Sequence, residues 1–197
     1  MPPEIRARLL VLDTGPLITL AAADSLDYLL YPGLPVVLPD AVLFEATNDA
    51  SRLGAQAVLE WVQKHEGPVR TVSTHALFDH LQLLSAGQES RQKNLGERAA
   101  IEVINEATEL APNERVLLLS EDDRALRAGG ATAFDRFIPL TTLDFLTELE
   151  VARRINSAEE VYQRAADGGR LASRREALRS QTEAAIAAVQ AILQKQQ

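Results

Sequence analysis

The sequence contains no cysteine among its 197 residues. A disulfide-linked fold, a cysteine-ligated zinc site and a thiol nucleophile are therefore excluded. Long apolar runs are also missing, because none approaches the roughly 18–20 residues that a membrane-spanning helix needs. An apolar stretch near the start looks like a signal peptide, but the polar turn that begins at Asp13 interrupts it. We therefore expect a cytoplasmic protein that does not bind a membrane.

The sequence also has fewer basic residues than acidic ones, 20 Lys and Arg against 28 Asp and Glu. The net charge of −8 argues against a broad nucleic-acid-binding surface, because such surfaces are usually basic. A nuclease remains compatible with this charge, since a metal site built from carboxylates is itself acidic. The charge is uneven along the chain: residues 151–197 contain 8 Lys and Arg against 5 Asp and Glu. The excess of acid therefore belongs to the residues before 151.

Short apolar runs alternate with helical patterns over the first part of the chain. The runs Leu9–Leu12, Val36–Leu38 and Val116–Leu119 predict buried strands, and Val69–Val72 and Phe137–Leu140 predict two more. The helices that we predict between them lie at 41–48, 50–65 and 97–110. This alternation is typical of an α/β domain with a central, mainly parallel sheet of about five strands. Ligands of such sheets bind beyond the carboxyl ends of the strands.

The last part of the chain, rich in Ala, Arg and Gln, has a different character. Two pairs with capping-box spacing predict helices over 157–167 and 173–194. These pairs are Ser157 with Glu160 and Ser173 with Glu176. The second helix has an apolar stripe that must be buried on the domain, on a second copy or on a partner. We therefore divide the chain into a domain over 1–150 and a helical extension over 151–197.

Carboxylates follow the predicted strands at the edge where ligands bind. Asp13 directly follows the first strand, and Asp122 and Asp123 follow a later one. If the two strands are neighbours, their ends lie about 5 Å apart. Glu45 and Glu97 each follow a chain reversal that can return them to the same edge. Carboxylates this close repel one another unless a cation compensates them, and Mg²⁺ or Mn²⁺ is the hard ion that suits oxygen ligands.

Each acid taken alone also has a structural explanation. An Asp after a strand usually forms a turn or caps a helix, and Asp40 fits the N-cap of the helix that carries Glu45. Glu97 fits an acid in the first turn of a helix, where the helix dipole favours it. Asp122 and Asp123 fit the cap of a following helix. Only the ordered set of these acids, each at the end of a predicted element, distinguishes a metal site from these structural roles.

The order of these motifs resembles the PIN domain, a family of metal-dependent ribonucleases. The motifs are Leu-Val-Leu-Asp13-Thr14, the acid Glu45 on the helix after strand two, Gly96-Glu97 at the start of an Ala-rich helix, and Ser120-Glu121-Asp122-Asp123 after a strand. The resemblance covers roughly residues 7–150 and is greatest to the VapC-like toxins of type II toxin–antitoxin pairs. It implies a three-layer α/β/α fold. The sequence departs from the pattern in having Glu rather than the commoner Asp in the third motif.

The resemblance also implies the chemistry of the site, which is hydrolysis of RNA with Mg²⁺ or Mn²⁺. The catalytic residues that it implies are Asp13, Glu45, Glu97, Asp122 and Asp123. Of these, Asp13, Glu97 and Asp122 or Asp123 would hold the metal, and Glu45 would bind metal or orient the attacking water. Ser120 favours Asp122 as the ligand, whereas the run Asp-Arg-x-Leu favours Asp123. Thr14 and Ser120 would hydrogen-bond the carboxylates or water.

The expected partners follow from the same resemblance. RNA would be the substrate, an antitoxin protein would be the partner of a toxin, and the chain would form a homodimer. The basic residues nearest the acids are the candidates for RNA contacts, namely Arg98, Arg124, Arg127 and Lys93. The alternative to an enzyme is a noncatalytic PIN-like RNA-binding or regulatory module.

Two other chemistries fit less well. Asp13-Thr14-Gly15 is similar to an aspartic protease motif, but that chemistry needs two such aspartates in an all-β fold. The histidines His65, His75 and His80 lack the spacing of a metal site, and we interpret them as structural or exposed.

Overall fold

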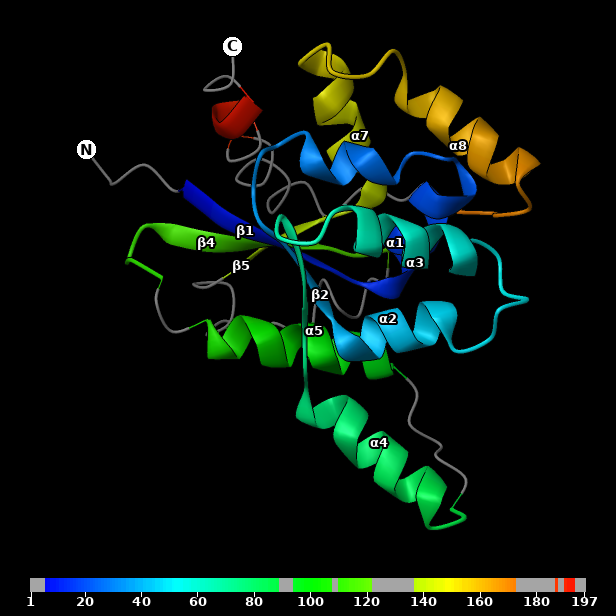
Figure 1. Ribbon diagram of the computed structural model, residues 1–197. Coiled ribbons are helices and arrows are strands. Elements are labelled where there is room, and N and C mark those ends of the chain that lie inside the picture. Colours follow the sequence, from blue (N-terminus) through cyan, green and yellow to red (C-terminus); the bar gives the residue numbers. More distant parts are fainter. Residues whose placement is uncertain are drawn as a thin grey trace.

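The computed structural model describes residues 6–88, 94–107, 110–121, 137–172, 187 and 190–193. Within this part of the chain, five strands form one parallel sheet in the order β3-β2-β1-β4-β5 (Figure 1). The strands are β1 (Arg6–Leu12), β2 (Val36–Pro39), β3 (Val69–Val72), β4 (Glu114–Leu119) and β5 (Phe137–Leu140). The prediction of a central sheet is confirmed, and all five predicted runs are strands.

The order of the strands places β1 at the centre of the sheet. The chain adds β2 and β3 on one side of β1 and then crosses to the other side for β4 and β5. The strand order therefore reverses between β1 and β4, which is the position where open parallel sheets bind ligands. Leu12 pairs with Leu119 in the register of these strands. The next residues, Asp13 and Ser120, consequently leave the sheet side by side.

Helices cover both faces of the sheet and make the three layers that we predicted (Figure 1). Leu10 and Leu12 face one core, and Val11 faces the other, as the alternation of side chains along a strand requires. The first face is covered by α1 (Thr14–Ala22), the 3₁₀ helix η1 (Leu26–Leu30), α3 (Ala55–Lys64), α7 (Thr142–Val151) and α8 (Ala158–Asp167). The second face is covered by α5 (Leu95–Glu106), against which α2 (Asp40–Thr47) and α4 (His75–Ser85) pack.

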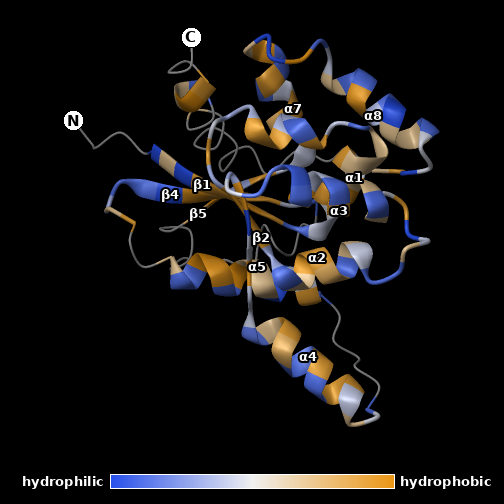
Figure 2. Cartoon of the chain, viewed as in Figure 1, coloured by the Kyte–Doolittle hydropathy of each residue, from blue (hydrophilic) through white to orange (hydrophobic). Residues whose placement is uncertain are grey.

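The sequence analysis did not predict α1 or α4. The residues from Asp13 to Pro16 are not a simple polar turn, because α1 begins at Thr14, directly after β1. This helix is apolar on most sides and buried, so it lacks the amphipathic pattern that predicts a surface helix. The helix α4 is mostly exposed instead: Ala76 is its one buried residue, and Phe78, Leu81 and Leu84 are exposed. Figure 2 shows both hydrophobic and hydrophilic residues along this helix.

The described part of the extension packs onto the same core as α1. Ser157 caps α8 by accepting a hydrogen bond from the backbone N–H of Glu160, as the capping-box spacing predicts. Val161 and Tyr162 of α8 are buried in the core beneath it, and so is Leu193 near the end of the chain. Most of the helix predicted over 173–194 lies outside the described residues. No helix among those described is long and apolar enough to span a bilayer.

Glu148 of α7 is a buried carboxylate beneath the C-terminal residues. The side-chain amide of Gln190 donates a hydrogen bond of 2.9 Å to its Oε2. Burial raises the pKa of Glu148 above its ordinary value of 4.5, the Gln190 hydrogen bond partly opposes this rise, and the nearby Asp144 adds to it. The folded protein therefore binds this proton more tightly than the unfolded chain does. Its stability consequently falls as the pH rises from 4.5 through the raised pKa.

Glu148→Gln is expected to remove this loss of stability above pH 4.5, because the neutral amide still accepts the Gln190 hydrogen bond. Thermal unfolding midpoints measured from pH 4 to pH 8 should show a higher midpoint for the variant at neutral pH. The exposed Glu160 of α8 is the control, and Glu160→Gln should follow the wild-type profile. Identical pH profiles for Glu148→Gln and the wild type would contradict the expectation.

Candidate active site

Asp13 is held at the carboxyl end of β1 by contacts from two elements. Its Oδ1 accepts a hydrogen bond of 2.7 Å from the backbone N–H of Thr14, so it serves as the N-cap of α1. Its Oδ2 accepts a hydrogen bond of 2.7 Å from the Ser120 hydroxyl, which follows β4. The side chain is buried, with 9% of the residue exposed. The neighbouring strands β1 and β4 therefore fix both oxygens of one carboxylate.

Glu45 reaches the same edge of the sheet through Thr14. The Thr14 hydroxyl donates a hydrogen bond of 2.7 Å to Glu45 Oε2. Thr14 stands in the first turn of α1, and Glu45 stands on α2, which follows β2. Arg52 donates from its guanidinium to the carbonyl oxygen of Glu45 and so also holds the backbone there. One threonine thus bonds to the carboxylates of the first two sequence motifs.

Gly96 allows the third motif to approach this pair. A Cβ atom at Gly96 would lie 2.7 Å from Glu45 Oε2 and 2.8 Å from Thr14 Oγ1, which is closer than real Cβ contacts. Only glycine therefore lets the first turn of α5 lie against the hydrogen bond between Thr14 and Glu45. Glu97 follows Gly96 in that first turn. The structure consequently brings the start of α5 to the edge where Asp13 lies.

Glu97 and Arg98 line a surface pocket of about 670 Å³ along α5. Glu102 and Glu106, one turn apart on the same helix, line it further along. Arg98, a predicted RNA-binding residue, therefore shares a pocket with a predicted metal ligand.

The remaining predicted site residues, namely Asp122, Asp123, Arg124, Arg127 and Lys93, lie outside the described part of the chain. Among the residues that the structure does describe, Asp13, Glu45 and Glu97 do not bring their carboxylate oxygens within 4.8 Å of one another. The link between Asp13 and Glu45 runs instead through Thr14.

A family model of the PIN domain matches residues 9–110, a little more than half of the chain. The chain belongs to the PIN-domain family. The matched region contains Asp13, Glu45 and Glu97 and ends before Asp122. A search of the curated proteins finds no match to the chain. PIN domains are generally nucleases.

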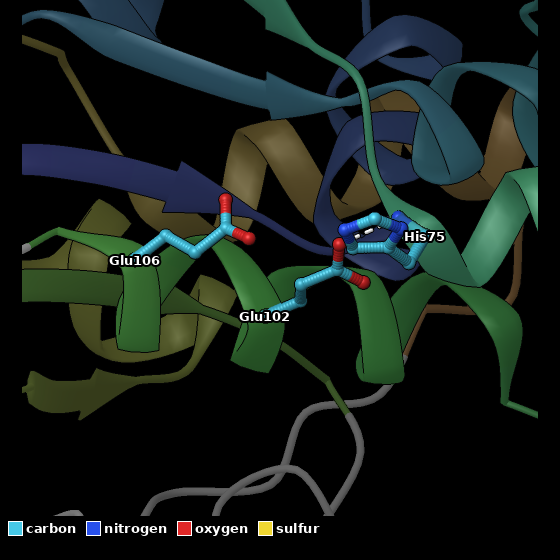
Figure 3. Close-up of side chains that lie close together, drawn as sticks. All are labelled: His75, Glu102 and Glu106. Atoms are coloured by element: carbon cyan, nitrogen blue, oxygen red, sulfur yellow. Dashed lines mark hydrogen bonds between the residues drawn. The ribbon is translucent and has the colours of Figure 1, made fainter.

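Three further side chains of the PIN domain form a cluster beside the pocket, namely His75, Glu102 and Glu106 (Figure 3). One potential metal-ligand atom from each, an imidazole nitrogen or a carboxylate oxygen, lies within 4.8 Å of the other two. Both oxygens of Glu102 accept hydrogen bonds from α4, one from the backbone N–H of His75 and one from that of Ala76. Glu102 therefore caps the N-terminus of α4 and fastens that helix to α5.

The remaining histidines are in structural contacts, as predicted. The Nε2 atom of His65 lies 2.9 Å from Asp27 Oδ1, and its ring is tilted against that of Trp61. The ring of His80 meets that of Phe44 edge-on. His75 is exposed.

Asp40 does not cap the helix that carries Glu45. It is the first residue of α2, and the N-cap position is occupied by Pro39 without a side-chain hydrogen bond. The Asp40 carboxylate instead accepts hydrogen bonds from the backbone N–H and the hydroxyl of Thr74, which precedes α4. The sequence could not separate these two roles, because Thr74 lies 34 residues away.

Glu121 has a buried side chain that the sequence analysis did not single out. It belongs to the fourth motif, but its carboxylate lies among the hydroxyls of Thr19 on α1 and Thr142 on α7. The Glu121 carboxylate therefore lies between α1 and α7.

Proposed function

We propose that this PIN domain is a metal-dependent endoribonuclease that hydrolyses phosphodiester bonds of RNA. The observation that supports this most is the hydrogen-bonded run from Ser120 to Asp13 and from Thr14 to Glu45. It lies where the strand order reverses between β1 and β4, which is the position of ligand sites in open parallel sheets. It also joins side chains of three separate sequence motifs at one edge.

The chemistry of the donor set fits a hard divalent ion. Carboxylate oxygens are the ligands that Mg²⁺ and Mn²⁺ prefer. The residues that would hold the ion are Asp13, Glu97 and either Asp122 or Asp123. The close approach at Gly96 supports this set, because it brings the helix that carries Glu97 against the residues that bind Asp13 and Glu45. When bound, the ion supplies an activated water and stabilises negative charge on the phosphate.

The chain's own residues keep the carboxylates oriented. Ser120 and the backbone of Thr14 each donate one hydrogen bond to Asp13. A carboxylate oxygen has more than one lone pair, so these bonds are compatible with metal binding by the same group. The Thr14 hydroxyl fixes one oxygen of Glu45, whose other oxygen would serve metal or attacking water. Holding these groups before substrate arrives reduces the rearrangement that the reaction requires.

Basic residues near the acids would position the RNA backbone. Arg98 lines the pocket beside Glu97. Lys93, Arg124 and Arg127 are the further candidates from the sequence. An arginine can bind two phosphate oxygens at once, which suits it to orienting the scissile phosphate.

The test is cleavage of a mixed pool of structured and single-stranded RNAs with Mg²⁺, with Mn²⁺ and with EDTA. Wild-type protein should cleave with metal and lose the activity in EDTA. Glu97→Gln should lower the rate by about 100-fold, as removal of a charge-stabilising group typically does. The matched control is Glu160→Gln, which removes the same charge from an exposed residue of α8 outside the pocket and should keep the wild-type rate. Equal activity of the wild type with metal and with EDTA would contradict the proposal, and no cleavage under any condition would favour a noncatalytic RNA-binding module.

The partners belong to the same proposal. We propose that the chain acts as a homodimer and as the toxin of a toxin–antitoxin pair. An adjacent small reading frame that encodes a DNA-binding antitoxin would support the toxin role, and its absence would favour a stand-alone RNA-processing nuclease. Light scattering at micromolar concentration tests the dimer, and a monomeric mass would contradict it.

A further inference from the structure

Glu121 is a buried carboxylate that joins three separate parts of the fold. Its side chain is 8% exposed. Its Oε1 accepts hydrogen bonds of 2.7 Å from Thr19 on α1 and 2.9 Å from Thr142 on α7. Its Oε2 accepts a hydrogen bond of 3.1 Å from the guanidinium of Arg170, beyond the end of α8. A buried charge with this many partners holds the backbone of its own residue firmly in place.

The position of Glu121 connects it to the proposed site on both sides. Ser120, the preceding residue, donates to Asp13, and the candidate ligands Asp122 and Asp123 come next in the sequence. A Cβ atom at Gly15 would lie 3.1 Å from the Cβ of Glu121, so this side chain packs directly on the first turn of α1. A shift of Glu121 would therefore be transmitted to the residues that hold Asp13.

The turn that ends α8 places Arg170 next to Glu121. The backbone N–H of Arg170 bonds to the carbonyl of Ala165, and that of Gly169 bonds to the carbonyl of Ala166. Gly169 has a φ of 93°, which completes the pattern of a Schellman motif. A Cβ atom at Gly168 would lie 2.6 Å from the carbonyl oxygen of Ala22, so this turn packs closely against the end of α1. The turn thus fixes the direction in which the chain leaves α8.

We infer that Arg170 is a positioning residue of the proposed nuclease site and acts through its ion pair with Glu121. This rests on the proposed function. Arg170 also donates to the Thr19 hydroxyl at 3.3 Å, so one guanidinium binds both the carboxylate and a hydroxyl that itself binds that carboxylate. Residues beyond α8 thereby contribute a side chain to the surroundings of Glu121, from a position 60 residues beyond the matched PIN region that ends at 110. Without the arginine, the buried carboxylate of Glu121 loses the cation that pairs with it.

The test is Mn²⁺ affinity by calorimetry, together with RNA cleavage, on the full chain. Arg170→Gln should weaken Mn²⁺ binding and lower kcat by about 10- to 100-fold, as loss of a residue that orients metal ligands typically does, with KM for RNA little changed. Arg164→Gln is the matched control, because Arg164 lies on α8 just before Arg170 in the sequence and bonds to Ala23 and Ser25 instead of Glu121. It should retain the wild-type affinity and kcat.

The double variant Arg170→Gln, Glu121→Gln separates positioning from general stability. The neutral amide oxygen still accepts from Thr19 and Thr142, and the uncompensated charge is gone, so most of the Mn²⁺ affinity and kcat should return. Arg170→Lys, which keeps the charge, should lie between the wild type and Arg170→Gln and serves if that variant fails to fold.

The outcomes of these measurements are distinct. Equal Mn²⁺ affinity and kcat in Arg170→Gln and Arg164→Gln would overturn the inference, and so would a double variant that is no better than Arg170→Gln. A wild-type protein that neither binds Mn²⁺ nor cleaves RNA would instead contradict the proposed function.

Discussion

Asp13→Asn is expected to lower RNA cleavage by at least about 100-fold while leaving the fold intact. Asparagine caps helices as well as aspartate does, and its amide oxygen can still accept the hydrogen bond from the backbone N–H of Thr14. The Ser120 hydroxyl can rotate to accept from the new amide N–H in place of donating to Oδ2. The substitution therefore removes the negative charge and one metal-binding oxygen with little change to the contacts around them.

The measurement compares initial rates of Asp13→Asn and wild type with Mg²⁺ and with Mn²⁺, alongside their thermal unfolding midpoints. Asp79→Asn removes the same charge from the exposed face of α4 and is the matched control. Full activity in Asp13→Asn would exclude Asp13 as the central ligand. A large fall in its unfolding midpoint would show that Asp13 acts mainly as the cap of α1.

The sequence predicted the sheet well because strands of a buried parallel sheet are continuous apolar runs. All five strands appear as short apolar runs, and the parallel order then follows from the helices between them. The sequence left open whether the strands before Asp13 and Ser120 are neighbours. The structure pairs β1 with β4, and Ser120 donates a hydrogen bond to Asp13. The carboxyl ends of β1 and β4 could be recognised as a candidate site from the sequence.

Contacts between residues that lie far apart in the sequence could not be predicted in this way. The role of Glu121 depends on Thr19, Thr142 and Arg170, which lie on three other segments and share no spacing with it. The cap that Glu102 provides for α4 likewise depends on how two helices pack. Sequence periodicity reports which face of one element is buried, but not which polar groups meet across elements.

Glycine at position 96 illustrates the difference, because its importance lies entirely in what surrounds it. In an ordinary helix, replacing glycine by alanine is stabilising by about 0.5–1 kcal/mol. Here the added methyl group would lie 2.7 Å from Glu45 Oε2 and 2.8 Å from Thr14 Oγ1. Both atoms are ends of side chains that can rotate away, so the helix can keep its place while the hydrogen bond between Thr14 and Glu45 breaks.

Gly96→Ala is therefore expected to retain a near-wild-type unfolding midpoint and to lose cleavage by about 10- to 100-fold, the usual effect of disturbing a group that orients catalytic ligands. The loss should match that of Glu45→Gln, and the double variant should be no worse than either single one, because both act on the same carboxylate. Rates and unfolding midpoints of the three variants test this. Additive losses in the double variant would show that Gly96 acts apart from Glu45, and a fall in the midpoint with unchanged rates would show that the close approach matters only for packing.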